Sequence, residues 1–355
     1  MPGDTIKIGF SLMDLALGGA QIFYVDLAER LSQRGHSVHY HLFAERENES
    51  LCDKRLYLRL NRRASAASIR DLVRCDVLHL DGYHTPQHKK NFGKYLFKCI
   101  ETYHSEFSFR TSAPVYAPNR VAVSFALQKK IPLSCEVIYN GFDTAAFAPI
   151  PCKKEWDLAI LGRIHPAKNH LLFLDICSRV ARIRPLRAMM IGGYPWDDDY
   201  SAEVRRKISE LQDAGIDIHV TGFVEHEKIP LLLNQARVLL VTSPSESFGR
   251  MAAEALACEV PVIANDTGGL GEIVTHGRTG FLTRFNDAED FSQLALRLLD
   301  DDLLRERMGR QGRKDVEEKF SIAETVRRYE QMYERIRNEA QSERRGWPKE
   351  RRTTK

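Results

Sequence analysis

Short apolar runs rich in β-branched residues alternate with helical patterns along most of this chain. In the first half these runs cover residues 6–12, 38–43, 76–80, 100–104, 121–124 and 135–140. In the second half they cover residues 157–161, 188–191, 216–221, 238–241 and 260–264. Strands that alternate with helices form parallel βαβ units, because a parallel connection needs a crossover. The pattern therefore predicts an α/β fold with two doubly wound sheets.

A turn-rich segment near residues 145–153 separates the two series. The chain has 355 residues, about twice the usual size of one domain, so two domains are expected. We predict a domain over residues 1–148, a second over residues 149–320, a closing helix over 321–340 and a basic flexible tail over 341–355. Ser321 and Glu324 have the capping-box spacing that starts the closing helix. Other helices are predicted over 171–182, 202–211, 248–257 and 288–299.

Charge and composition exclude several classes of protein. Lys and Arg number 52 and Asp and Glu 48, giving +4. The last fifteen residues hold six basic and two acidic residues, so the first 340 residues are neutral overall. They show no positive charge excess of the kind that binds nucleic acid. No stretch of about 18 apolar residues predicts a membrane span. The N-terminus lacks a secretory leader, and seven scattered cysteines fit reduced thiols better than disulfides or zinc. We expect a cytoplasmic protein.

The densest motif is SPSESFGRMAAEALACEVPVIANDTGG, residues 243–269. If a helix starts near Phe248, then Phe248 and Gly249 present backbone N–H groups and the positive helix end to an anion. Glu246 can accept hydrogen bonds from hydroxyls. Glu254 lies in an otherwise apolar helix, where a carboxylate is costly unless it meets a partner. A helix-end charge and a solvated face residue are the plainer readings of these two carboxylates, but the pattern favours a ligand site.

Three further segments could bind anions or sugars. In LGRIHPAKNH, Arg163 and Lys168 follow a strand, at the edge where open α/β sheets bind ligands. Gly18 and Gly19 follow the first strand and could let a ligand approach, although they do not form a dinucleotide fingerprint. His104 ends a predicted strand and could stabilise charge near a leaving group. Solvated basic residues, a tight turn and a surface histidine are the respective alternatives.

Together these motifs resemble the retaining, GT-B-fold glycosyltransferases of family 4. The resemblance covers nearly the whole chain through GGAQ, TYHS, VIYNGFD, GRIHPAKN, TGFV, ESFGRMAAEA and PVIANDTGG. It implies two Rossmann-like doubly wound domains facing across a cleft, with the acceptor on the first and a nucleotide-sugar on the second. The closing helix would return to the first domain. Two positions depart from the family pattern: Glu259 replaces a glycine after Cys258, and Gly271 replaces a proline.

The resemblance also assigns roles to residues of this chain. Arg163 and Lys168 would hold the diphosphate, Glu254 the ribose, and Glu246 the transferred sugar. His104 would contact the donor sugar. The implied catalytic residues are His104, Arg163, Lys168 and Glu246. The implied substrate-binding residues are Gly18, Gly19, Phe223, Val224, Ser247, Phe248, Gly249 and Glu254.

The implied reaction is a retaining transfer of a hexose or N-acetylhexosamine from a nucleotide-sugar, most simply a UDP-sugar. The acceptor would be a hydroxyl of a glycan, a lipid-linked glycan or a small molecule, as in polysaccharide biosynthesis. No cofactor and no metal are expected, and the basic tail could contact anionic membrane peripherally. Two alternatives on the same fold are a nucleotide-sugar 2-epimerase and a non-catalytic nucleotide-sugar-binding subunit. A nicotinamide oxidoreductase is disfavoured because the glycine fingerprint is absent.

Overall fold

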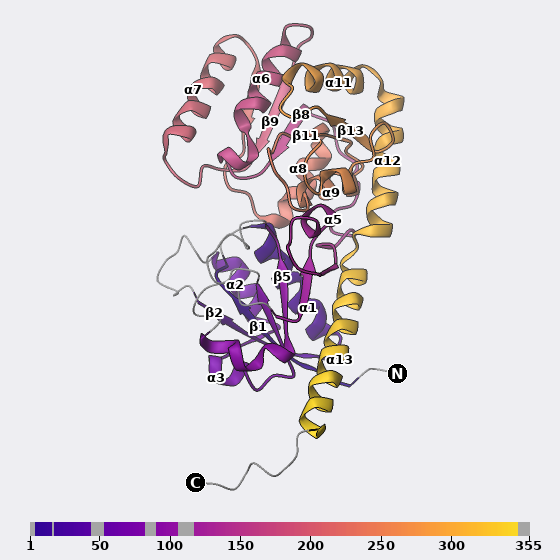
Figure 1. Cartoon of the computed structure of the whole chain (residues 1–355). Coiled ribbons are helices and arrows are strands. Elements are labelled where there is room, and N and C mark those ends of the chain that lie inside the picture. The colour runs from indigo at the N-terminus through magenta and orange to yellow at the C-terminus, as the bar shows by residue number, and fades with distance from the viewer. Residues whose placement is uncertain (1–3, 16–17, 44–52, 82–89, 106–116, 347–355) are drawn as a thin grey trace. The chain divides into compact units, whose positions relative to one another are not determined.

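The computed structural model describes residues 4–15, 18–43, 53–81, 90–105 and 117–346 (Figure 1). These residues form two compact units: residues 1–142 with 322–355, and residues 143–321. The sequence placed the break slightly later, at 148/149. Phe142 is fully buried, and its carbonyl accepts a 3.0 Å hydrogen bond from Ile322 N–H, which assigns it to the first unit. The tail from residue 347 lies outside the described residues.

The first unit contains a parallel sheet in the order β3-β2-β1-β4-β5-β6-β7. Its strands are β1 (Lys7–Leu12), β2 (Ser37–Leu42), β3 (Ser65–Ala66), β4 (Val77–Asp81), β5 (Cys99–Tyr103), β6 (Asn119–Ala122) and β7 (Glu136–Val137). Its helices are α1 (Gly19–Gln33), α2 (Lys54–Asn61), α3 (Ile69–Leu72), the 3-10 helix η2 (Gly93–Lys98), α5 (Phe125–Gln128) and α13 (Ile322–Gly346). Phe23, Leu27 and Leu31, spaced four apart, form the buried face of α1 as predicted.

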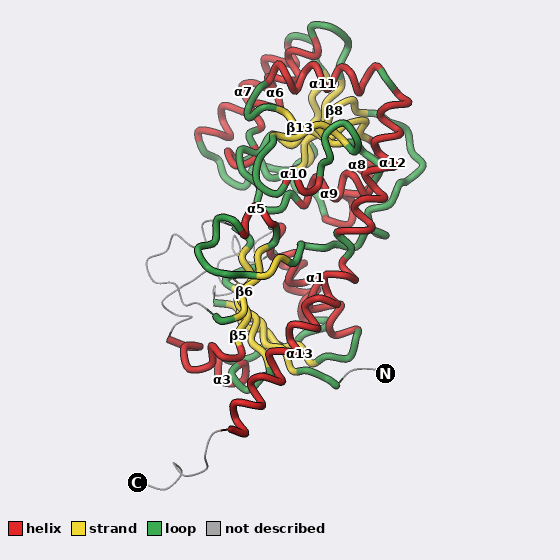
Figure 2. The backbone as a smooth tube through the Cα atoms, turned by 45° about the vertical axis from the view of Figure 1, so that its right-hand side comes forward, coloured by secondary structure: helices red, strands yellow, loops and turns green. Residues whose placement is uncertain are grey.

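The second unit contains a parallel sheet in the order β10-β9-β8-β11-β12-β13. Figure 2 shows its strands in yellow, with β8 and β13 labelled and helices around them. Its strands are β8 (Trp156–Leu161), β9 (Arg187–Ile191), β10 (Asp217–Val220), β11 (Ala236–Val241), β12 (Val262–Asn265) and β13 (Gly280–Thr283). Its helices are η4 (Pro166–Lys168), α6 (His170–Ala181), α7 (Asp199–Asp213), η5 (His226–Lys228), α8 (Ile229–Gln235), α9 (Arg250–Ala257), α10 (Leu270–Ile273), α11 (Ala288–Asp300) and α12 (Asp302–Lys319). Two Rossmann-like doubly wound units are thus confirmed.

Helix α13 follows the second unit in sequence but packs beside α1 in the first (Figure 1). It continues to Gly346, beyond the predicted end at Ala340. A buried polar network holds it. Tyr333 Oη lies 2.7 Å from His79 Nδ1, and Thr102 Oγ1 lies 2.7 Å from His79 Nε2 and 2.9 Å from Tyr329 Oη. Burial lowers the pKa of His79, so the imidazole is neutral and bonds through both nitrogens.

A second buried polar group lies on β5. Glu101 is 1% exposed, and Tyr103 Oη donates to its Oε2 at 2.7 Å. Burial raises the pKa of Glu101 to about 7, which the hydrogen bond from Tyr103 opposes only in part. This carboxyl therefore changes charge near neutral pH.

None of the described helices combines the length and the apolar character needed to cross a bilayer.

Candidate functional site

The chain order of the second sheet reverses between β8 and β11, the two central strands. In open α/β sheets this switch point opens a crevice at the carboxyl ends of the strands. The loops that leave β8 and β11 carry Arg163, Lys168 and Glu246. The fold therefore brings together motifs that lie far apart in the sequence.

Glycines shape the loop after β8. Gly162 has φ +149°, and Gly192 is so close that a Cβ on it would lie 2.0 Å from Gly162 O. The Ile164 N–H donates to Gly193 O at 2.9 Å, which ties the loop to the segment after β9. His165 accepts the Ala167 N–H at 3.2 Å and starts the short helix η4. The pKa of His165 is lowered by burial and by the nearby charge of Arg163. Arg163 itself is exposed.

Lys168 reaches the loop after β11. Its Nζ donates to Glu246 Oε1 at 2.5 Å and lies 3.8 Å from Met251 Sδ. Thr242 Oγ1 donates to Lys168 O at 2.8 Å, so hydrogen bonds hold both the backbone and the side chain of Lys168. The side chains of Lys168 and Glu246 are 24% and 13% exposed, which leaves both within reach of a ligand. The family resemblance implies separate tasks for the two residues, and in the structure they form one ion pair.

The glycines of the ANDTGG motif pack against the backbone of the loop that carries Glu246. The Gly269 N–H donates to Glu246 O at 2.8 Å. A Cβ on Gly268, whose φ is +54°, would lie 1.9 Å from Glu246 O, and one on Gly269 would lie 2.6 Å from Ser247 O. Only residues without a side chain permit this approach, so the motif fixes the position of the Glu246 loop.

Helix α9 begins at Arg250, not at Phe248 as predicted. Gly249 is its N-cap and has φ +98°. Because this left-handed conformation is not helical, the helix starts only at the next residue, Arg250. Phe248 is 4% exposed and packs edge-on against Phe320, with 5.4 Å between ring centroids. Ser247 is half-buried. The helix N-terminus still provides backbone N–H groups beside the Lys168–Glu246 pair.

Glu254 is a buried residue of α9, not the solvated face residue of the plainer interpretation, and its partners in the structure are two side chains of the chain itself. Its side chain is 5% exposed, Arg250 Nε donates to its Oε1 at 2.7 Å, and His226 Nε2 lies 3.4 Å from the same oxygen. Burial raises the pKa of Glu254, but the contacts with His226 and Arg250 outweigh burial and the net pKa is lowered. The carboxylate is therefore ionised. Sequence reasoning missed Arg250 and His226, although Arg250 at spacing four was a visible signal.

A left-handed residue also ends α9. Glu259 has φ +58°. Its N–H donates to Leu256 O at 3.0 Å and the Val260 N–H donates to Ala255 O at 2.9 Å, the two bonds of a Schellman motif. The family resemblance implies a glycine at this position, and Glu259 adopts the left-handed conformation that glycine prefers.

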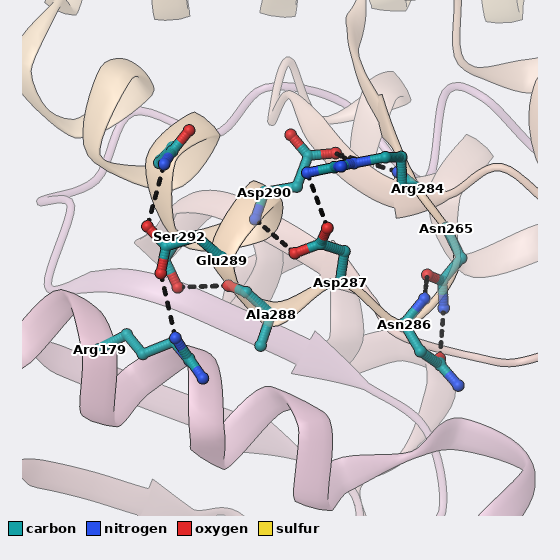
Figure 3. A network of polar contacts seen from close by, with 10 residues as sticks. Arg179, Asn265, Arg284, Asn286, Asp287, Ala288, Glu289, Asp290 and Ser292 are labelled. Carbon is teal, nitrogen blue, oxygen red and sulfur yellow. Dashed lines mark hydrogen bonds and ion pairs between the residues drawn. The ribbon is translucent and has the colours of Figure 1, made fainter.

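Asn265 connects the site to the neighbouring loops. It is fully buried, and its Nδ2 donates to Thr242 O at 3.0 Å and Ser243 O at 3.1 Å. Its Oδ1 accepts the Asn286 N–H at 2.8 Å, and Figure 3 shows this pair beside the capped start of α11. There Asp287 accepts the Asp290 N–H at 3.0 Å. Asn265 thus anchors the strand end that leads to Glu246, a role that sequence reasoning did not identify.

The TGFV segment follows β10. Phe223 is 60% exposed, and Val224 is half-buried. A Cβ on Gly193 would lie 2.7 Å from the Phe223 ring, so the ring rests on glycine backbone.

Three predicted residues belong to the first unit. Gly18 is the N-cap of α1, and Gly19 is exposed with open space where a Cβ would stand. His104 follows β5, and its Nδ1 lies 3.2 Å from Asn140 Nδ2. Burial lowers the pKa of His104 to about 3, so its imidazole is neutral. Within the described ranges, no group of three or more His, Cys, Asp or Glu residues could hold a metal ion.

Comparison with known proteins shows what the chain is similar to. Residues 143–315 match the family model of the glycosyl transferases group 1. Curated proteins are similar to parts of the chain. N-acetyl-alpha-D-glucosaminyl L-malate synthase of Bacillus anthracis is 36% identical over 35% of this chain and 32% of its own length. D-inositol 3-phosphate glycosyltransferase of Kribbella flavida is 32% identical over 50% of this chain and 46% of its own. The matches thus span under half of these two relatives.

Solved structures extend the similarity in fold to both units. HepE of Anabaena in complex with UDP-glucose has a TM-score of 0.76 at 20% identity, covering 92% of this chain and 99% of HepE. Sucrose-phosphate synthase of Thermosynechococcus elongatus has a TM-score of 0.76 at 18% identity, covering 93% and 99%. The fold is therefore GT-B.

Proposed function

We propose that the chain is a glycosyltransferase of group 1 and a retaining enzyme of family 4. It transfers a hexose or N-acetylhexosamine from a nucleotide-sugar, most simply a UDP-sugar, to the hydroxyl of a glycan, a lipid-linked glycan or a small molecule. The observation that carries the proposal is the Lys168–Glu246 pair at the start of α9. It places a cation, a carboxylate and a helix N-terminus together at the switch point of the sheet.

Each component suits one part of the donor. A lysine and a helix N-terminus both attract phosphate oxygens, and Arg163 on the same loop adds a fork of donors. Glu246 can accept hydrogen bonds from sugar hydroxyls, and Glu254 from the ribose. Phe223 and Val224 border the proposed base-binding edge. His104, Gly18 and Gly19 of the first unit are proposed to contact the donor sugar and the diphosphate.

The proposed chemistry needs no side-chain base. The bond between the anomeric carbon and the diphosphate oxygen breaks, and the bond to the acceptor oxygen forms on the same face. The acceptor proton passes to a donor phosphate oxygen. Negative charge develops on the leaving diphosphate, and Arg163, Lys168 and the N-terminal end of α9 stabilise it without a metal. Glu246 and Glu254 are therefore not a glycosidase acid/base pair.

The relatives are consistent with this choice. The HepE structure contains UDP-glucose, and the curated relatives named above are a synthase and a glycosyltransferase. Neither the epimerase nor the non-catalytic subunit is favoured. A cytoplasmic location is proposed on the sequence composition.

A thermal-shift panel tests the proposal. UDP-, GDP-, ADP- and dTDP-sugars are added with EDTA, and a ligand at 100 times its Kd stabilises by about 2.7 kcal/mol. We expect a UDP-sugar to give the largest shift, and Lys168→Met to reduce it. Lys207→Met, on α7 beside Glu210, is the matched control. Transfer with retained anomeric configuration, followed by NMR, completes the test. No shift with any donor would contradict the proposal.

A further inference from the structure

Arg250 is a buried cation in the first turn of α9. It is 8% exposed, and its Nε donates to Glu254 Oε1 at 2.7 Å, one turn further along the helix. Neither the family resemblance nor the proposed mechanism gives Arg250 a task.

Helix stability does not account for an arginine at this position. A cation in the first turn opposes the helix dipole, which favours anions there. An arginine that precedes its glutamate by four residues is also the weaker order for such a pair. A buried ion pair is often no more stable than apolar side chains of similar volume. The neighbours on this helix, Ala252, Ala253 and Ala255, are apolar and fully buried. An apolar residue at position 250 would therefore suit the helix itself.

The contact with Arg250 does have a clear effect on the Glu254 carboxylate. Arg250 and His226 both reach Oε1, so neither side chain holds the second oxygen, Oε2. The guanidinium makes the shorter of the two contacts and orients the carboxylate, and His226 and Arg250 together lower the pKa of Glu254 and keep it ionised in an apolar helix. One carboxylate oxygen is held by these two side chains, and the proposed function assigns the other to a ligand hydroxyl.

We propose that Arg250 is a positioning residue for the nucleotide ribose and acts through Glu254. It holds the carboxylate in the orientation that accepts hydrogen bonds from the ribose hydroxyls. This inference rests on the proposed function, in which Glu254 contacts the ribose.

The test compares two ligands that differ only in those hydroxyls. Calorimetry with UDP and with 2′,3′-dideoxy-UDP gives the ribose preference of each variant. We expect the intact protein to prefer UDP by about tenfold to a hundredfold, as for hydrogen bonds to a charged group. Arg250→Leu should lose most of that preference and bind dideoxy-UDP as the intact protein does. Arg250→Lys keeps a charge and a donor and should retain part of the preference.

A double variant separates positioning from general destabilisation. If Arg250 acts through Glu254, then Arg250→Leu in a Glu254→Gln background causes no further loss of preference. Thermal unfolding checks that each variant folds, and Arg250→Met replaces Arg250→Leu if that variant does not. An unchanged ribose preference in Arg250→Leu or Arg250→Met overturns the inference alone. Failure of the intact protein to bind UDP, or an unchanged preference in Glu254→Gln, overturns the proposed donor site and this inference with it.

Discussion

Lys168 Nζ lies 2.5 Å from Glu246 Oε1, so the cation proposed for the diphosphate and the carboxylate proposed for the sugar neutralise each other. A donor that enters this site adds phosphate charge beside Lys168. The lysine must then share its donors between the phosphate and Glu246. This competition gives the two residues different predicted phenotypes.

Glu246→Gln should leave UDP affinity unchanged or raise it a few-fold, because Lys168 loses its anionic competitor. Turnover should fall, since the sugar loses a charged acceptor. Lys168→Met should instead lower UDP affinity about tenfold or more. Calorimetry and steady-state kinetics measure the two effects. Equal losses of UDP affinity in both variants would contradict the competition.

Transfer should continue in EDTA. The motifs at the proposed donor site contain no Asp-x-Asp pair, and Arg163 and Lys168 offer positive charge in place of a divalent ion. The initial rate, measured before and after chelation, should agree within error. A rate that falls on chelation and returns with manganese or magnesium would refute the metal-free mechanism.

Glu259→Gly should stabilise the second unit by about 1 kcal/mol, because a side chain at φ +58° carries left-handed strain that glycine avoids. The midpoint of thermal unfolding should rise by about 2–4 °C for a unit of this size. Glu259→Ala is the control: it removes the carboxylate but keeps the Cβ, so it should show no comparable gain. A gain of equal size in both variants would assign the effect to charge.

Stability should depend on pH through Glu101. Its folded pKa is raised to about 7 from an ordinary value of 4.5, so the folded state binds the extra proton and its stabilisation is lost as pH rises between these values. Glu101→Gln should remove this loss, so its stability relative to the intact protein should increase by up to about 3 kcal/mol from pH 4.5 to pH 8. Urea unfolding at several pH values measures the difference. Parallel pH profiles would show that Glu101 does not titrate near neutrality.

The basic tail gives a salt-dependent prediction. Residues 347–355 include Lys349, Arg351, Arg352 and Lys355, each worth about 1 kcal/mol near an anionic surface. Deleting this segment should abolish co-sedimentation with phosphatidylserine vesicles at low salt and leave UDP binding unchanged. If the truncated protein sediments as the intact one does, the tail has no membrane role.

The sequence predicted most strands of both sheets because short apolar runs with β-branched residues, such as residues 260–264, are a clear local signal. It missed β13 (Gly280–Thr283), a strand of only four residues. It also missed α12, which contains Gly309 and Gly312, residues of low helix propensity. In the structure a Cβ on Gly309 would lie 2.1 Å from Glu259 O, and one on Gly312 would lie 2.6 Å from Leu256. These glycines are packing sites, and packing partners cannot be read from a local pattern.

In the candidate site, too, the residues were predictable from local patterns but their packing partners were not. Loop motifs located Lys168, Glu246 and Glu254 because each follows a strand or interrupts an apolar helix. The partners were not predictable from spacing alone: Lys168 and Glu246 are 78 residues apart. The contact between His226 and Glu254 likewise depends on how the loop after β10 packs against α9.

The chain leaves the first unit after Phe142 and returns to it at Ile322. The second unit is therefore an insertion within the first. During synthesis, residues 143–321 leave the ribosome as a continuous segment and can fold before α13 exists. His79 and Thr102 receive Tyr329 and Tyr333 only when α13 emerges. The half of the molecule that begins the chain is therefore the half that is completed last. A fragment of residues 143–321 should be obtainable alone, whereas one of residues 1–142 should expose an unfilled core and aggregate.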